Sequence, residues 1–303
     1  MPKVTGPLFS VDAKGTLADI LTYQGGFGKH RAQKKPAHRD TFSAPQLIER
    51  LLFLEGRDHW SSLSTEDKAT YNSLGHKQGM TGYNYVIKEF KKGRIRGGCR
   101  LFPPMQEGQG TKVYDRSGYG NDGEIHGATW EQLPSGLWVL SFNGTDAYVD
   151  CGDISTSNWQ NLTVESWLKW DGSTMDSYRV FLYKGYSSDV GSHAVHFNGS
   201  LLVQNGNGDF YLDSNGDLPS NQWAHYVYKY DQSAGKEYIL VNGIKKGEQA
   251  RSGNIPQNYD SLQIVRADKY HFSSLIDGVR IYNEAKSEKW IRERYQLTKA
   301  FFQ

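Results

Sequence analysis

The chain has 303 residues, of which 37% are hydrophobic, and a formal net charge of +2. This length accommodates two ordinary domains, and the 19 Tyr, 8 Trp and 33 Gly favour sheets and turns over a helical bundle. No apolar run approaches the roughly 20 residues of a membrane span. The first residues lack the apolar stretch of a secretory signal, so we expect no membrane and synthesis in a cytoplasm.

The charge is unevenly distributed along the chain. Residues 1–98 carry 16 Lys and Arg against 9 Asp and Glu, and the remainder carries 19 against 24. Opposite signs predict two modules, residues 1–98 and residues 99–303, joined by the basic, glycine-rich segment Lys92–Gly98. The two cysteines, Cys99 and Cys151, are expected to be reduced thiols, and a bridge between them is left open.

The first module has the signals of a small α+β unit. Leu8–Tyr23 predicts two strands around a turn at Lys14–Gly15, and Gly25–Arg39 predicts a flexible basic arm. Capping residues followed by helical periodicity then predict three helices. They run from Thr41 or Ser43 to about Leu54, from Thr65 to Leu74 after the cap Ser64, and from Tyr83 to Phe90.

The basic arm allows three interpretations: a solvated loop, a clamp on a neighbouring subunit, or a contact with nucleic acid. Its cations could neutralise phosphates, but no aromatic residues alternate with them to stack on bases. They are Lys29, Arg31, Lys34, Lys35 and Arg39. We therefore do not expect nucleic acid as the partner, and keep a nucleic-acid-associated protein as an alternative.

The second module alternates short strands with turn signals, which predicts an antiparallel β-sandwich. The glycine-rich run Val113–Trp130 reads as strand, tight turns and strand. In Leu162–Lys169, apolar and small residues alternate with Thr163, Glu165, Trp167 and Lys169. The predicted strands are Arg100–Pro103, Gly123–His126, Leu137–Phe142, Tyr148–Asp150, Asn161–Lys169, Arg179–Tyr183, Ala194–Phe197, Ser200–Val203, Phe210–Leu212, Gln222–Tyr230, Glu237–Val241, Lys245–Glu248, Ser261–Ile264 and Ser274–Tyr282.

Five motifs of this module resemble, in order, those of laminin-G-like (concanavalin A-like) jelly-roll domains. They are Glu107–Gly123, Leu140–Val149, Leu162–Lys169, the pair Asn221–His225 and Tyr238–Gly243, and Ile276–Glu288. The resemblance implies a mainly β fold, an antiparallel jelly-roll sandwich preceded by the small α+β module. One departure is Pro103–Pro104, which removes ladder donors and predicts a first strand that is short or at an edge.

The resemblance also implies a calcium ion near the ends of the first and last strands. The matching positions are Asp115, Asn121 and Asp277, whose oxygens are of the kind calcium prefers. The alternative is that Asp115 and Asn121 only make hydrogen bonds within their turn, and that Asp277 orders its own corner.

Glycan binding is the other implication of this fold, and it needs aromatic planes beside polar groups. The candidates are Tyr183, Tyr186, Tyr211, Trp170, Asn205, Asn207 and Asp209. The chain lacks the carboxylate triplet of glycosidases with this fold and any recognisable zinc pattern. We therefore predict no catalytic residue and no enzyme, with a polysaccharide-degrading enzyme as the alternative.

Residues 6–90 resemble the N-terminal part of structural proteins of tailed bacteriophages. The pattern includes Gly6–Leu17, a basic arm, Trp60–Tyr71 and Met80–Tyr85. The resemblance implies a virion component (capsid decoration, head fibre or tail) that assembles with other virion proteins, as a homo-oligomer, and displays the jelly roll toward host-surface glycans. At the C-terminus, Ser287 is predicted to cap a helix, and Phe301–Phe302 to dock on a sheet or a partner.

Overall fold

The computed structural model describes residues 15–17, 21–24, 31–34, 43–95, 97–171, 179–185, 191–197, 201–205, 220–255, 260–265 and 273–302. The chain forms two compact units, Met1–Phe42 and Ser43–Gln303. The predicted division at residues 98 and 99 lies inside the second unit, just before its first strand. The helices that follow Ser43 therefore belong with the sheets.

The first unit contains one antiparallel sheet. Strand β1 (Gly15–Leu17) pairs with β2 (Leu21–Gln24), and β2 pairs with β3 (Arg31–Lys34). The chain reverses between Leu17 and Leu21, not at Lys14–Gly15, because Gly15 itself pairs with Tyr23. The prediction of a flexible arm is wrong for Arg31–Lys34, because these residues pair with the second edge of β2. The charge pattern does not reveal this pairing, since it depends on the backbone donors and acceptors of that edge.

Three helices begin the second unit: α1 (Ala44–Ser62), α2 (Thr65–His76) and α3 (Gly82–Lys91). The predicted caps are confirmed, with a capping box at Ser43 and a bond from the Asp67 N–H to the Ser64 hydroxyl. Helix α1 runs eight residues past the predicted end. Its Gly56 lies against α3, where an added Cβ would be 3.0 Å from Ile87 Cδ1, so this glycine marks a close helix contact and not a helix end.

The strands of the second unit form two antiparallel sheets, which confirms the predicted sandwich. The eight-stranded sheet has the order β16 (Ile244–Ala250), β15 (Lys236–Val241), β14 (Trp223–Asp231), β10 (Asn161–Trp170), β18 (Ser273–Tyr282), β8 (Trp138–Asn143) and β7 (Thr129–Gln132), and β4 (Cys99–Leu101) pairs with β18. The seven-stranded sheet has the order β13 (Leu201–Asn205), β12 (Gly191–Phe197), β11 (Arg179–Gly185), β17 (Leu262–Ile264), β9 (Tyr148–Asp150), β6 (Gly123–His126) and β5 (Lys112–Val113). Strand β4 is as short as Pro103–Pro104 predicted, whereas β5 and β7 were not predicted as separate strands, and the predicted strand Phe210–Leu212 lies outside the described residues.

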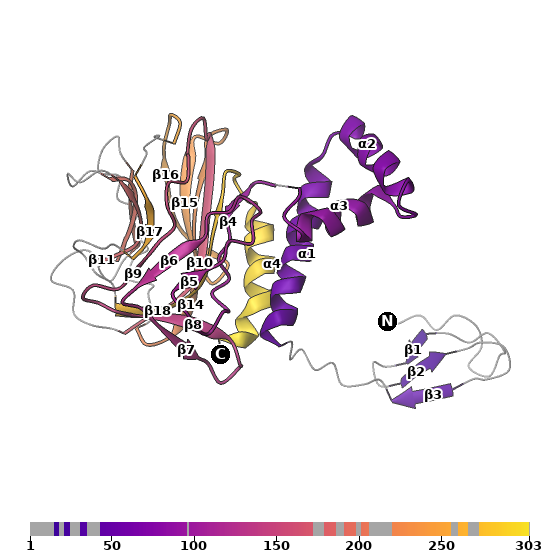
Figure 1. Ribbon diagram of the computed structural model, residues 1–303, viewed down its shortest axis with the longest axis horizontal. Helices are drawn as coiled ribbons and strands as arrows, with labels where there is room; N and C mark the ends of the chain where they lie inside the picture. The colour runs from indigo at the N-terminus through magenta and orange to yellow at the C-terminus, as the bar shows by residue number, and fades with distance from the viewer. Residues whose placement is uncertain are drawn as a thin grey trace. The chain divides into compact units, whose positions relative to one another are not determined.

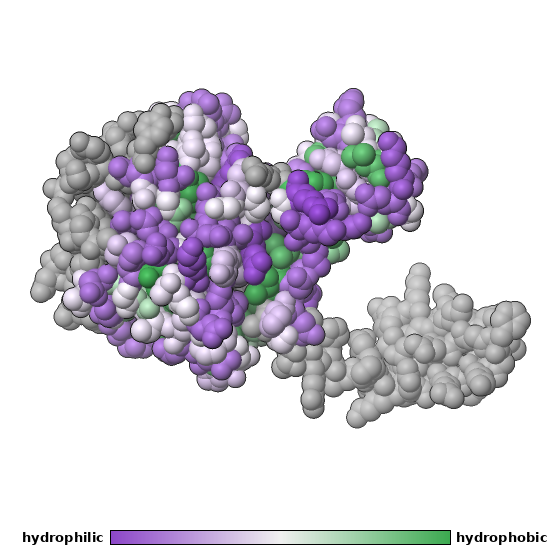
Figure 2. Space-filling view, viewed as in Figure 1, coloured by the Kyte–Doolittle hydropathy of each residue, from purple (hydrophilic) through white to green (hydrophobic). Residues whose placement is uncertain are grey.

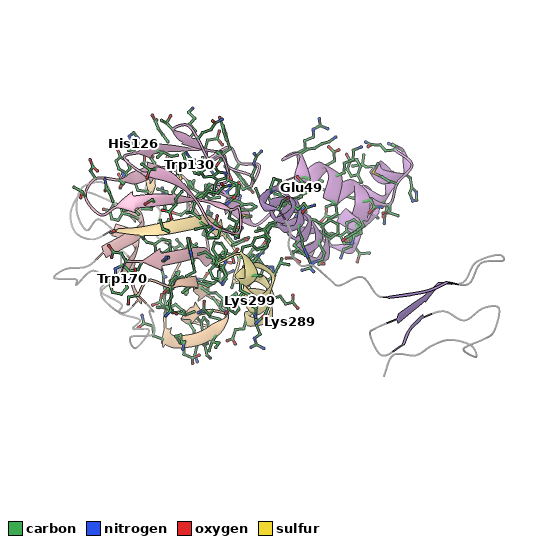
Figure 3. The ribbon with its side chains drawn as sticks, turned by 90° about the horizontal axis from the view of Figure 1, so that it is seen from below. Glu49, His126, Trp130, Trp170, Lys289 and Lys299 are labelled. Atoms are coloured by element: carbon green, nitrogen blue, oxygen red, sulfur yellow. The ribbon has the colours of Figure 1, made fainter. Side chains whose placement is uncertain are left out.

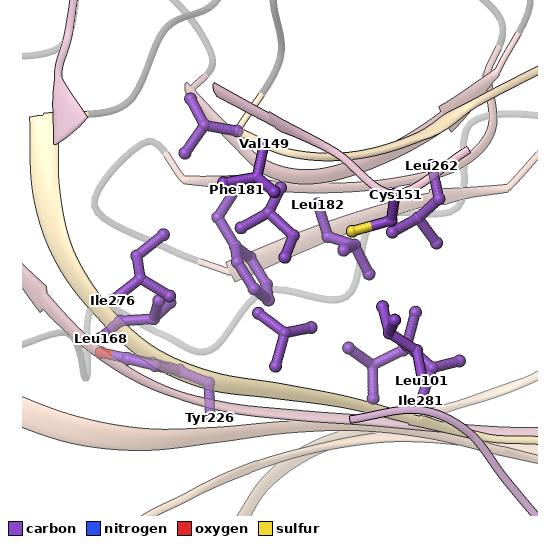
Figure 4. Packing of buried hydrophobic residues seen from close by; sticks show 14 of the residues in the cluster. Leu101, Val149, Cys151, Leu168, Phe181, Leu182, Tyr226, Leu262, Ile276 and Ile281 are labelled. Atoms are coloured by element: carbon purple, nitrogen blue, oxygen red, sulfur yellow. The ribbon is translucent and has the colours of Figure 1, made fainter. Parts of the chain in front are cut away.

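The core lies between the two sheets and follows the predicted alternation. Leu162, Val164 and Leu168 of β10 point into it from the eight-stranded sheet, against residues such as Val149 and Leu182 of the other sheet. Figure 4 shows this packing, including the Cys151 sulfur among aliphatic side chains. Both cysteines are buried and unbridged, which confirms the reduced thiols, and burial raises the pKa of each.

Helices cover the other face of the eight-stranded sheet. Figure 1 shows α1 and α4 (Glu288–Thr298) side by side against this sheet, with the seven-stranded sheet on the far side. Ser287 caps α4 as predicted. The turn η1 (Lys299–Phe301) follows, and the Phe302 ring stacks on Trp167 of β10 at 4.3 Å between centroids. The terminal phenylalanines therefore dock on the sheet.

The described surface carries mostly polar side chains. In Figure 2 hydrophilic residues predominate on the visible face, and hydrophobic ones gather where α1 and α4 meet. Among the described residues, no helix combines the length and the apolar character that crossing a membrane requires.

Candidate functional site

A pocket of about 230 Å³ opens where β8, β10 and β18 end together. Antiparallel pairing brings its lining together, because Phe142 opposes Ser274 across β8 and β18, and Lys169 opposes Leu275 across β10 and β18. The lining residues are Ser141, Phe142, Lys169, Asp171, Asn221, Ser273, Ser274 and Leu275. We call this site the serine pocket.

The polar side chains of the serine pocket hold unused hydrogen-bonding capacity. The Ser274 hydroxyl is buried, at 5% exposure for the residue, and has no hydrogen-bond partner among the described residues. The contacts of the described residues give no partner to the Ser141 and Ser273 hydroxyls or to the Lys169 ammonium. Ser274 lies on the core face of the sheet with Phe142 and Ile276, so the polar groups that a ligand could reach are those of Ser141, Ser273 and Lys169.

The backbone at the pocket mouth is held firmly. The Asn221 N–H donates to the Trp170 carbonyl at 2.7 Å, and the Asn221 carboxamide donates to the Asp171 carbonyl at 3.0 Å. Asn221 has φ = 57°, in the left-handed region that asparagine tolerates. Its side-chain oxygen remains available to accept a hydrogen bond, so donors and acceptors both line the pocket.

Trp170, a predicted sugar contact, stands next to this pocket. It opposes Ser274 in the register of β10 and β18, and its buried indole N–H has no partner in the part of the chain that the structure describes. The indole also packs against the core. Figure 3 shows Trp170 at the side of the sandwich away from Lys289 and Lys299.

The other predicted sugar contacts do not join this pocket. Tyr183 is buried at 7% exposure and lies on β11, in the other sheet. Asn205 ends β13, whose backbone alone is described. Tyr186, Asn207, Asp209 and Tyr211 lie outside the described residues.

Two of the three predicted calcium residues meet in one turn. Each carboxylate oxygen of Asp115 accepts two hydrogen bonds, from the Phe102 and Ser117 N–H groups and from the Ser117 hydroxyl and the Asn121 N–H. The Asn121 carboxamide donates to the Arg100 carbonyl. These bonds occupy the oxygens that an ion would use, so the turn is held without one.

The third predicted calcium residue has different partners. Asp277 is buried and accepts a hydrogen bond from the Gln106 carboxamide at 2.7 Å. Burial raises its pKa to about 7, although Arg280 and the Gln106 hydrogen bond favour the charged form. Within the described part of the chain, no three Asp, Glu, His or Cys side chains gather to hold a metal ion. The calcium site stays a prediction, and we derive no chemistry from it.

The most strongly perturbed carboxyl group lies beneath the helices. Burial alone would raise the pKa of Glu165, but Arg294, Arg280 and a hydrogen bond with His225 hold it well below its usual range. Glu165 is 0% exposed. A substrate has no access to this group, so its role is structural.

Sequence reasoning missed the serine pocket itself. Ser141 and Ser273 are 132 positions apart and come to the same face of the sheet only through the pairing of β8 with β18. Their immediate sequence carries no motif. The one usable signal was Trp170, which the aromatic content had already singled out.

The comparisons with known proteins concern the sandwich. Residues 143–292 match a family model described as the concanavalin A-like lectin/glucanases superfamily. No curated protein matches the chain. Domain 4 of the arabinanase AbnA from Geobacillus stearothermophilus, solved with arabinotriose, is 16% identical with a TM-score of 0.52 over 69% of this chain and 100% of that chain.

Two further similar structures are parts of larger chains. The binding domain of Paraclostridial Mosquitocidal Protein 1 is 15% identical with a TM-score of 0.53, over 65% of this chain and 52% of that one. A Trypanosoma rangeli sialidase mutant is 13% identical with a TM-score of 0.51, over 68% and 33%. The chain thus spans about half the length of the first and a third of the second. At these identities the likeness shows the fold alone: a mainly β, concanavalin A-like jelly roll preceded by helices. It gives no support to the bacteriophage resemblance of residues 6–90.

Proposed function

We propose that this chain is a carbohydrate-binding protein that holds a saccharide in the serine pocket. The observation that carries the proposal is the polar lining of the pocket: the Lys169 ammonium and the Ser141 and Ser273 hydroxyls lie on one face of the sheet and have no partner in the contacts of the described residues. The family match over residues 143–292 and the arabinanase domain solved with arabinotriose support the ligand class.

A saccharide suits this pocket for chemical reasons. Sugar hydroxyls both donate and accept, and so do serine hydroxyls, while Asn221 offers an acceptor and Lys169 offers donors only. A concave site with a few convergent polar groups gives orientation and specificity. The pocket of about 230 Å³ would take one sugar residue of a longer chain.

We propose binding without catalysis. Hydrolysis of a glycoside normally needs two carboxyl groups that flank the bond, and Asp171 is the one carboxylate among the described lining residues. A virion setting, in which residues 1–98 anchor the protein among other virion proteins and the jelly roll faces a host glycan, rests only on the sequence resemblance. It stays a prediction, as does a homo-oligomer.

A glycan array with the full chain, followed by titration of the best glycan, tests the proposal. The Ser141→Ala variant should bind about 3–10 times more weakly, because one hydrogen bond is worth roughly 0.5–1.5 kcal/mol. Its melting temperature should not fall, because the contacts of the described residues give this hydroxyl no partner. The exposed Ser252, which lies outside the pocket, provides the matched control Ser252→Ala.

Two results would contradict the proposal. One is full-strength binding by Ser141→Ala and by Lys169→Gln, which would place the ligand elsewhere. The other is release of new reducing ends when the bound glycan is incubated with the protein, which would favour the enzyme alternative.

A further inference from the structure

A larger groove, of about 580 Å³, lies between the helices and the glycine-rich turn that joins β5 to β6. Three segments of the second unit form it: the start of α1, the end of α3 and the turn. Its lining residues are Pro45, Ile48, Glu49, Leu52, Lys91, Lys92, Gly93, Asp115, Arg116, Gly118 and Gly120. Nothing in the serine pocket contributes to it, and we call it the turn groove.

Backbone contacts hold one wall of the turn groove in place without a ligand. Gly93 and Gly118 touch through their backbones, and an added Cβ on Gly118 would lie 3.0 Å from the Gly93 carbonyl oxygen. Both have positive φ, 68° and 86°, which glycine adopts without strain. The hydrogen bonds of Asp115 fix the same turn from inside, so its backbone stays in place without a ligand.

The acidic side chains that line the groove already have partners. Glu49 forms an ion pair with Lys91, and Asp115 accepts four hydrogen bonds from N–H and O–H donors. Lys92 lies 3.8 Å from Glu89, which is also paired with Arg94.

One cationic side chain and two backbone N–H groups of the groove have no partner among the described residues. The exposed Arg116 side chain forms no ion pair or hydrogen bond with the described residues. The backbone N–H groups of Gly118 and Gly120 likewise have no acceptor among the described contacts, and both residues have positive φ. The N–H of Tyr119, between them, donates to the Ser117 hydroxyl. Free backbone N–H groups of a tight turn beside a guanidinium can hold an anionic oxygen.

We propose that the turn groove binds the anionic group of a ligand: a carboxylate, sulfate or phosphate. Arg116 supplies two parallel donors, Gly118 and Gly120 supply backbone donors, and Lys92 adds positive charge at the rim. The apolar floor of Pro45, Ile48 and Leu52 lets the rest of the ligand pack beside the anion. This site does not depend on saccharide binding in the serine pocket.

Amide NMR of the full chain tests the proposal with sodium sulfate, phosphate and acetate as probes, at constant ionic strength in sodium chloride. We expect at least one anion to shift the Gly118 and Gly120 amide signals with saturation. The preferred probe identifies the anion. The Asn221 amide, at the serine pocket, should not move, so this test and the glycan test can fail separately.

Arg116→Gln should weaken the saturable binding about tenfold, as expected for a lost charge-assisted hydrogen bond. Lys112→Gln is the matched control, because Lys112 is exposed on the same hairpin and does not line the groove. Because Arg116 is exposed, its replacement should leave the fold intact. Shifts that never saturate with any probe, or that are equal in Arg116→Gln and the wild type, would overturn the proposal.

Discussion

The outer face of the eight-stranded sheet lies under α1, α4 and η1, whereas the outer face of the seven-stranded sheet carries exposed polar side chains. On the covered face, Glu165 and His225 are 0% exposed. On the open face, Glu124 is exposed, and His126 and Tyr148 are half-buried and stack on each other at 4.5 Å. Both faces follow the same alternation of the strands, and on the eight-stranded sheet the helices turn surface residues such as Glu165 into interior ones.

The covered face therefore has to satisfy charges that water would otherwise solvate. Glu165 lies 3.1 Å from Arg280 and 3.3 Å from both His225 and the Tyr282 hydroxyl. Glu55 of α1 completes the cluster, because it accepts hydrogen bonds from Tyr282 and Arg294. On the open face, Glu124, Asp150 and Gln263 oppose one another across β6, β9 and β17, and Glu124 is exposed to solvent. The difference indicates that α1 is part of the sandwich fold.

Deletion of residues 1–98 should have the largest effect. It removes Glu55 and leaves Arg294, at 3% exposure, without that partner in the interior. Breaking such a pair costs about 3–5 kcal/mol, and the outer sheet face is uncovered as well. We expect a fragment of residues 99–303 to lack a cooperative unfolding transition.

A fragment of residues 43–303 is the control, since it keeps the whole second unit and should melt as the full chain does. Circular dichroism during heating distinguishes the two. Cooperative melting of the shorter fragment within a few degrees of the longer one would show that α1 merely rests on the sheet.

Replacing one carboxylate on each face tests the comparison directly. Glu165→Gln should destabilise the protein by about 3–5 kcal/mol, because Arg280 and Arg294 lose a buried counter-charge. Glu124→Gln on the open face should change the free energy of unfolding by less than about 0.5 kcal/mol. Urea denaturation at pH 7 measures both values, and equal effects would refute the distinction between the faces.

The cost of Glu165→Gln should also depend on pH. The folded state holds the pKa of Glu165 below its unfolded value, so the charged group stabilises the fold above the unfolded pKa of about 4.3. That contribution is lost as the pH falls through the folded pKa. The difference between wild type and variant should therefore shrink in acid.

The sequence predicts the covered face in part. The alternation in β10 and β14 and the caps of α2 and α4 are local signals, and the structure confirms them. The partner of Arg294 was not predictable, because Glu55 lies 239 positions away and only tertiary packing joins the two. The serine pocket was missed for the same reason. The short strands β5 and β7 were missed because a ladder of two to four residues beside glycine turns has too little periodicity to detect.

Asp277→Asn should have a smaller effect, of the opposite sign. Asp277 is buried on β18 and accepts a hydrogen bond from the Gln106 carboxamide. Burial raises its pKa from 3.8 to about 7, although Arg280 favours the charged form. The folded state therefore binds more protons than the unfolded state between about pH 4 and pH 7, and this group's contribution to stability is lost as the pH rises through that window.

Above pH 7 the wild type carries a buried charge that asparagine lacks, while asparagine still accepts the Gln106 hydrogen bond. One pKa unit corresponds to about 1.4 kcal/mol, so we expect Asp277→Asn to stabilise the protein at pH 8 by at most about 4 kcal/mol and to have a much smaller effect at pH 4.5, close to the unfolded pKa. Asp150→Asn on the open face is the control, because Asp150 is half-buried and its replacement can still accept the bond from the Gly152 N–H. Urea denaturation at pH 4.5 and pH 8 separates the two variants. A loss of stability at pH 8 for Asp277→Asn would mean that the charged form is favoured there, as it would be with a bound cation.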